Sequence, residues 1–204
     1  MWATATEVYE VADKNGYKKG LLVEEIMRNR GKGIYAGSAC MGGGISQALM
    51  NNNEELALEL LQLYRECFDE FFIEIHTNTM PEQHELNIKL VNFARKNKAP
   101  MIYAVDSHYL TQDEADMQQA FMGIGMRKKI TDEKTYNPTS DYYLMTEQEI
   151  RNSLAYLGQD VVDECFSGVE KFVNGLDLNI YIDRSRKVPK PFGVEDSDKT
   201  LVEK

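Results

Sequence analysis

The sequence predicts an α/β fold in which parallel strands alternate with flanking helices. Apolar runs at residues 33–36, 71–76 and 101–105 each precede a stretch whose apolar residues have helical spacing. Consecutive strand–helix repeats are typical of parallel strands joined by right-handed crossovers, as in a doubly wound sheet or a barrel. In both architectures the reactive residues lie at the carboxyl ends of the strands.

The first strand leads through a glycine-rich loop, residues 37–44, into a helix that we expect to begin near Ile45. After the asparagines at 51–53, a second helix restarts with Glu54 and Glu55 in its first turn, where acidic side chains favour the helix dipole. Helical spacing then predicts one buried stripe, made of Leu56, Leu60, Tyr64 and Cys67.

Capping boxes mark the starts of three further helices. Thr79 with Glu82 predicts the helix that follows the second strand, and its core-facing residues are Leu86, Leu90, Phe93 and Ala94. The other two boxes are Thr111 with Glu114 and Thr146 with Glu149. A last helix is expected from about residue 159 to 173.

Composition limits the classes of function. A net charge of -10 argues against a surface that binds nucleic-acid phosphates unaided, since that binding depends on Lys and Arg. No apolar run approaches the roughly 18 residues of a membrane span, and the start lacks the basic region of a secretion signal. Three widely spaced cysteines fit free thiols in a reducing compartment. We therefore expect a cytoplasmic protein with no membrane partner.

The pair Asp106 and His108 is the main candidate site. Both follow the third strand, and their spacing puts them on one side of an extended backbone. A carboxylate beside an imidazole is a compact half-site for a divalent metal. Cys40 follows the first strand on the same rim and would add a thiolate that suits zinc. An ordinary strand end, with the Asp capping a turn, is the alternative reading.

Glu74 and His76 are further candidates for this rim. They lie on one face of the second strand, opposite Phe71, Ile73 and Ile75. A solvated or partner-facing surface is an equally good interpretation of these two polar residues.

Three groups of segments resemble the PHP (polymerase and histidinol phosphatase) domain of bacterial or phage DNA polymerase III alpha subunits, the C-family replicative polymerases. The first is residues 33–49, which contain the Gly-Ser-Ala-Cys sequence. The second is residues 72–75 with 81–83, and the third is residues 105–110 with their Asp-Ser-His-Tyr-Leu sequence. Residues 142–144 and 188–192 are similar to the stretch that leads toward the polymerase palm.

The resemblance implies a distorted, TIM-like barrel whose rim holds divalent metal ions, usually zinc or manganese. Cys40, Asp106 and His108 match the last three ligands of that cluster. The family also needs an early His-x-His motif, whereas residues 1–39 contain no histidine. The resemblance therefore implies a partial PHP domain over residues 1–180 and a linker toward a missing palm over 181–204. We expect the remaining polymerase segments to act in cis or in trans.

Three functions remain open at this level. The first is that of a fragment of a DNA polymerase III alpha subunit, which contacts DNA through the parent polymerase. Its rim would then either supply 3'-5' exonuclease or phosphoesterase activity or give structural support to the polymerase. The second is a free-standing PHP phosphoesterase similar to histidinol phosphatase. The third is a non-catalytic scaffold completed by a partner chain. The polymerase active site is missing, so whether this chain is itself an enzyme, and with which catalytic residues, stays open.

Overall fold

A computed structural model describes residues 31–127 and 140–177 of the chain. Its elements all lie in the unit that ends at Asn174. The strands are β1 (Tyr35–Gly37), β2 (Glu70–His76) and β3 (Met101–Ala104), in the order β1-β2-β3. β2 pairs in parallel with both neighbours, so the α/β class and the parallel strands predicted from the sequence are confirmed. Within the described ranges these strands form a three-stranded sheet, and no barrel is shown.

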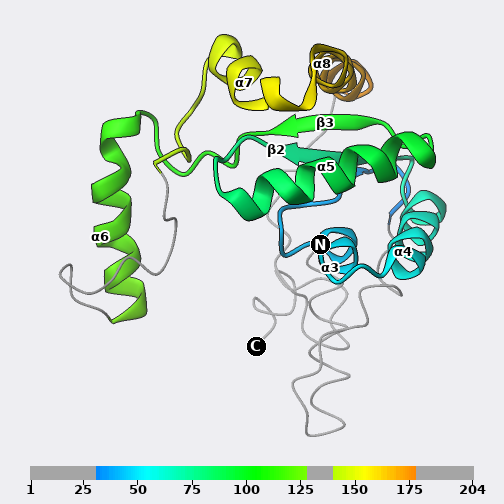
Figure 1. Cartoon of the computed structure of the whole chain (residues 1–204), viewed down its shortest axis with the longest axis horizontal. Helices are drawn as coiled ribbons and strands as arrows, with labels where there is room; N and C mark the ends of the chain where they lie inside the picture. The colour runs from blue at the N-terminus through cyan, green and yellow to red at the C-terminus, as the bar shows by residue number, and fades with distance from the viewer. Residues whose placement is uncertain (1–30, 128–139, 178–204) are drawn as a thin grey trace, which may run out of the picture. The chain divides into compact units, whose positions relative to one another are not determined.

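The helices connect and cover these strands (Figure 1). Along the sequence, α3 and α4 come between β1 and β2, α5 connects β2 to β3, and the remaining helices follow β3. Their bounds are α3 (Gly44–Met50), α4 (Glu54–Cys67), α5 (Pro81–Lys96), α6 (Ala115–Met126), α7 (Glu147–Leu154) and α8 (Gln159–Asn174), with short 3-10 turns η1 (Gln112–Glu114) and η2 (Ala155–Leu157). In the described part of the chain, no helix combines the length and the apolar character needed to cross a membrane.

The two faces of β2 carry different side chains. Phe71, Ile73 and Ile75 lie in the hydrophobic core with residues of α3, α5, α7 and α8. The alternate residues, Phe72, Glu74 and His76, occupy the other face. Phe72 packs against Phe172 of α8 at a ring distance of 5.5 Å, which leaves Glu74 and His76 as the polar part of this face near the carboxyl end of the strand.

Most predicted helix starts are confirmed. α3 begins at Gly44, α4 at Glu54, and capping boxes are present at Thr111 and Thr146. The predicted stripe of α5 is also confirmed, because Leu86, Leu90, Phe93 and Ala94 are all buried.

Two local predictions were wrong. α5 begins at Pro81 with Met80 at its N-cap, so Thr79 does not cap this helix. Proline suits the first helical position, because the missing N–H has no partner within the helix there. The predicted stripe of α4 was wrong in part. Cys67 is buried as predicted, but Leu56 is exposed, and Ala57 and Leu61 are fully buried in this helix. The linker predicted for 181–204 lies outside the described residues.

α8 covers the edge of β3 that faces away from β2. The carbonyls of Pro100 and Ala104 accept hydrogen bonds from β2, so the carbonyl of Met101 faces away from β2. Gly168 of α8 lies against that carbonyl: a Cβ at Gly168 would be 2.9 Å from the Met101 carbonyl carbon and closer still to its oxygen. Glycine at 168 is therefore required for this close approach.

We predict that Gly168→Ala lowers the free energy of unfolding by about 1–3 kcal/mol, because the added methyl group must push α8 away from the backbone of β3. Urea unfolding followed by circular dichroism measures this change.

Gly125→Ala in α6 is the matched control, since nothing lies within 4 Å of a Cβ at that position. Alanine is the better helix former, so this variant should be unchanged or more stable by up to about 1 kcal/mol. Equal effects of the two substitutions would contradict the close approach of α8.

Candidate rim site

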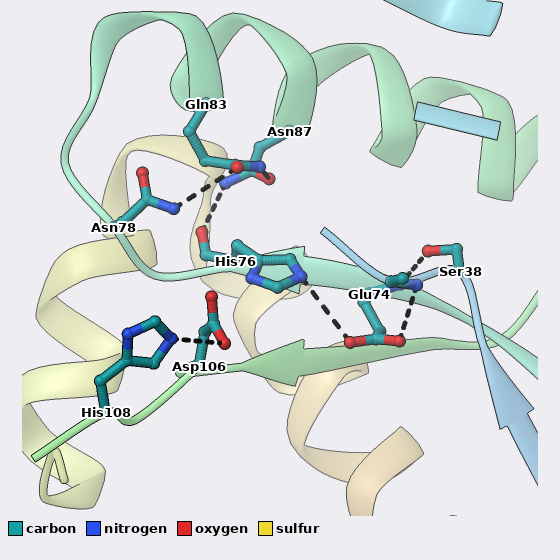
Figure 2. A network of polar contacts seen from close by, with 9 residues as sticks. Ser38, Glu74, His76, Asn78, Gln83, Asn87, Asp106 and His108 are labelled. Carbon is teal, nitrogen blue, oxygen red and sulfur yellow. Dashed lines mark hydrogen bonds and ion pairs between the residues drawn. The ribbon is translucent and has the colours of Figure 1, made fainter. Parts of the chain in front are cut away.

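The carboxyl ends of β2 and β3 bring two acid–imidazole pairs together (Figure 2). Glu74 and His76 come from the polar face of β2, and Asp106 and His108 come from the segment that follows β3. The parallel register pairs Ala104 with His76. Asp106 follows two residues later and therefore lies close to the end of β2. These four residues form what we call the rim site.

His76 lies between two carboxylates. Its Nε2 atom is 3.7 Å from Oε2 of Glu74, and Figure 2 shows Asp106 on the other side of the ring. The residue is only 5% exposed, and its Nε2 atom is buried with no hydrogen-bond partner among the residues that the structure describes. Burial lowers the pKa of His76 below its usual value of 6.5, while Glu74, Asp106 and the backbone of Ala39 oppose that shift. The imidazole is thus held largely neutral within an acidic site.

Glu74 is positioned by the end of β1. Its Oε1 atom accepts a hydrogen bond of 2.9 Å from the backbone N–H of Ala39, and its own N–H donates to Oγ of Ser38. A Cβ at Gly37 would be 2.8 Å from Cδ of Glu74 and would collide with Oε1. The absence of a side chain at Gly37 therefore leaves room for this carboxylate.

Asp106 has a backbone conformation that few residues adopt. Its φ of 55° lies in the left-handed region, which Asp tolerates better than most residues because its short side chain bonds locally. Oδ1 of Asp106 is 3.4 Å from Nε2 of His108. The turn at Asp106 thus places a carboxylate and an imidazole side by side just past β3, although the backbone there is not the extended one from which the pair was predicted.

A buried amide network supports the end of β2. Asn87 of α5 donates through Nδ2 to the carbonyl of His76 and to the hydroxyl of Tyr156, both at 2.8 Å. Gln83 donates to Oδ1 of Asn87 at 2.9 Å, and Asn78 lies 3.4 Å from Gln83 as a further donor. Figure 2 shows this chain of amides above the imidazole of His76. Because these groups are buried and paired, they restrict the backbone from which His76 projects.

Cys40 lies in the loop after β1 and is exposed. Among residues 31–127 and 140–177, no group of three or more His, Cys, Asp or Glu side chains is placed so that it could hold a metal ion. The structure therefore brings Asp106, His108, Glu74 and His76 together in pairs. The three-ligand set of Cys40, Asp106 and His108 stays a prediction.

Sequence reasoning missed the support of the site. Gln83 and Asn87 are spaced one helical turn apart on the same face as Leu86 and Leu90, and polar residues on an apolar stripe are a detectable signal of a buried network. The backbone carbonyl of Tyr142, which accepts from the N–H of His108 at 2.7 Å, gives no comparable signal in the sequence.

The fold and the site define a parallel α/β chain with an acid–imidazole rim. Comparisons relate this chain to DNA polymerase III alpha subunits. It is 31% identical over 140 residues to DNA polymerase III subunit alpha of Thermus aquaticus and 31% identical over 140 residues to that of Deinococcus radiodurans. The same subunit of Borreliella burgdorferi is 26% identical over 136 residues. No model of a known protein family matches the chain.

The matched segment covers 68% of this chain but only 12% of the Thermus protein and 10% of the Deinococcus protein. The chain is therefore a distant homologue of a small part of DNA polymerase III alpha subunits.

We predict that the stability of the chain decreases as the pH falls below 6.5 and that His76 is one cause. Since burial lowers the pKa of the folded imidazole, the unfolded state takes up a proton at a higher pH than the folded state does. The contribution is bounded by about 1.4 kcal/mol for each pH unit that separates the two pKa values.

Urea unfolding at pH 7.5 and 5.5, with a chelator present, measures this dependence. His76→Gln should reduce the difference in unfolding free energy between the two pH values. An unchanged difference in the variant would contradict a neutral, buried His76.

Proposed function

We propose that this chain is the later part of the PHP domain of a replicative DNA polymerase III alpha subunit, and that its rim contributes ligands to a divalent-metal site. The observation that carries this proposal is the Asp106–His108 pair at the end of β3, in a chain homologous to these subunits. Polymerase segments in cis or in trans would supply the remaining ligands.

The rim carries side chains of the chemical types that bind divalent ions. Carboxylate and imidazole ligands suit zinc and manganese, and the thiol of Cys40 would favour zinc. The unpartnered, buried Nε2 of His76 is a further observation in favour, because such an atom is unfavourable unless something binds it. Asp106, His108 and Cys40 would be ligands, and Glu74 and His76 would be further residues of the same rim.

A divalent ion at this rim would supply positive charge that activates water and stabilises the charge of a phosphate ester. The residues of the chain would hold and orient the reacting groups. The carboxyl ends of the strands are where both parallel sheets and barrels carry their reactive residues. Such a rim would support 3'-5' exonuclease or phosphoesterase activity, or would stabilise the structure of the parent polymerase, which binds the DNA.

We predict that the purified chain binds Zn²⁺ or Mn²⁺ and that His108→Ala and Cys40→Ala each weaken binding at least about tenfold, because each removes a ligand. Competition with a chromophoric chelator measures the affinity, and circular dichroism should show that the helices remain.

Asp163→Ala is the control, since this carboxylate lies in α8 and accepts from Arg151 and Gln159. It should leave metal affinity unchanged. Absence of bound metal, or equal affinity in all the variants, would end the ligand assignment.

Hydrolysis assays separate the possible roles. We expect a 3'-labelled oligonucleotide to be shortened only when the chain is combined with the segment that carries the early His-x-His motif, because that segment completes the ligands. Cleavage of small phosphate esters by the chain alone would favour a free-standing phosphoesterase. Metal binding without hydrolysis in the combined protein would favour structural support of the polymerase.

A further inference from the structure

Residues 140–144, which we call the strap, run alongside the segment that carries Asp106 and His108. The N–H groups of His108 and Tyr109 donate to the carbonyl of Tyr142 at 2.7 and 3.3 Å. The N–H of Leu144 donates in return to the carbonyl of Tyr109 at 3.2 Å. The strap and residues 107–109 are therefore joined like two short parallel strands, through a bridge between Tyr109 and Tyr143.

Side chains add to this attachment. Oγ of Ser107 donates to the carbonyl of Tyr143 at 3.3 Å. The ring of Tyr142 is buried and lies 5.2 Å from the imidazole of His108. The position of His108 thus depends on the strap for both its backbone and its ring.

Asp141 fastens the strap to the loop that follows β2. Its Oδ2 atom accepts a hydrogen bond of 3.0 Å from the backbone N–H of Thr79 and a second one from Oγ1 of Thr79. Two donors on one carboxylate oxygen form a charge-assisted contact, which is roughly twice as strong as a neutral one. Residues 62 positions apart are thereby held together.

The strap is also held at its other end. The hydroxyl of Tyr143 donates to Oε1 of Glu149 at 2.9 Å, and Oε2 of Glu149 accepts from the N–H of Thr146 at 2.8 Å. These contacts lower the pKa of Glu149, with the Thr146 side chain as the largest cause. Tyr143 thus ties the strap to the start of α7, and Asp141 ties it to the loop after β2.

We propose that Asp141 is a positioning residue that sets His108 relative to the end of β2. It binds Thr79, holds the strap beside residues 107–109, and through Tyr142 fixes the place of His108 next to Asp106. The claim that this placement serves metal binding rests on the proposed function. The placement itself is independent of it.

Amide hydrogen exchange of the whole chain, resolved by NMR and recorded without metal, tests the placement. Asp141→Ala should speed exchange at the amides of His108, Tyr109 and Leu144 by about tenfold or more, because a charge-assisted contact is lost. Exchange at Ile73 and Ile75, within the sheet, should change much less. Asp141→Asn, which keeps an acceptor for one Thr79 donor, should restore part of the protection.

Asp163→Ala in α8 is the matched control. Asp163 is also an exposed carboxylate with side-chain donors, Arg151 at 3.0 Å and Gln159 at 3.0 Å. It should leave exchange at His108 unchanged. Unchanged exchange at His108 in Asp141→Ala would overturn the proposal, and so would a uniform increase across the sheet, since that would indicate general loss of stability.

A Zn²⁺ titration of the same variants gives the second readout. If the wild-type chain binds zinc, Asp141→Ala should weaken binding several-fold and Asp141→Asn less, while Asp163→Ala should have no effect. If the wild-type chain binds no zinc but exchange at His108 responds to Asp141, the metal proposal fails and the positioning role stands.

Discussion

The pairing of β2 between β1 and β3 is the constraint on which the rest of the described structure depends. The N–H of Ser38 donates to Phe72 and the N–H of Ile73 donates to Pro100, both at 2.9 Å, so the strands run in one direction with their carboxyl ends together. A slip of one residue would turn Glu74 and His76 into the apolar core and bring Ile73 and Ile75 out of it. The same hydrogen bonds that form the sheet therefore also decide which side chains meet at the rim.

The rim contains two features that are unfavourable on their own. His76 buries a ring nitrogen without a hydrogen bond, and Asp106 holds a left-handed backbone conformation. Each is unfavourable by itself, by about 1–3 kcal/mol, and the surrounding contacts must stabilise them. The amides around Asn87 and the backbone of Tyr142 provide such contacts. Features of this kind also occur at functional sites, where local preferences are overridden.

Most of the fold could be predicted from local patterns, because strand alternation, capping boxes and the stripe of α5 involve residues close in sequence. The exceptions have physical reasons. α4 carries apolar residues at Leu56, Ala57, Leu60 and Leu61, so two stripes are available, and only docking against the sheet selects the one with Ala57 and Leu61. Thr79 has the sequence environment of a helix cap, but a carboxylate from far along the chain binds its donors.

The same distinction applies to the site. Asp106 and His108 could be recognised because their spacing is local and because they follow an apolar strand. The alternation of β2 also indicated that Glu74 and His76 share a face. The burial of His76, its position between two carboxylates, and the support from Asn87 depend on how separate elements pack. Such contacts leave no periodic signal, so they become visible only in three dimensions.

The position of Gly168 against Met101 has a consequence for association between molecules. The outward-facing carbonyls of an uncovered edge strand are a template onto which another chain can add. With α8 lying over Met101, an incoming strand cannot pair there without first displacing a helix that is anchored in the core by Val162 and Cys165. The close helix–strand contact thus protects the chain from aggregation at this edge, as well as holding the fold together.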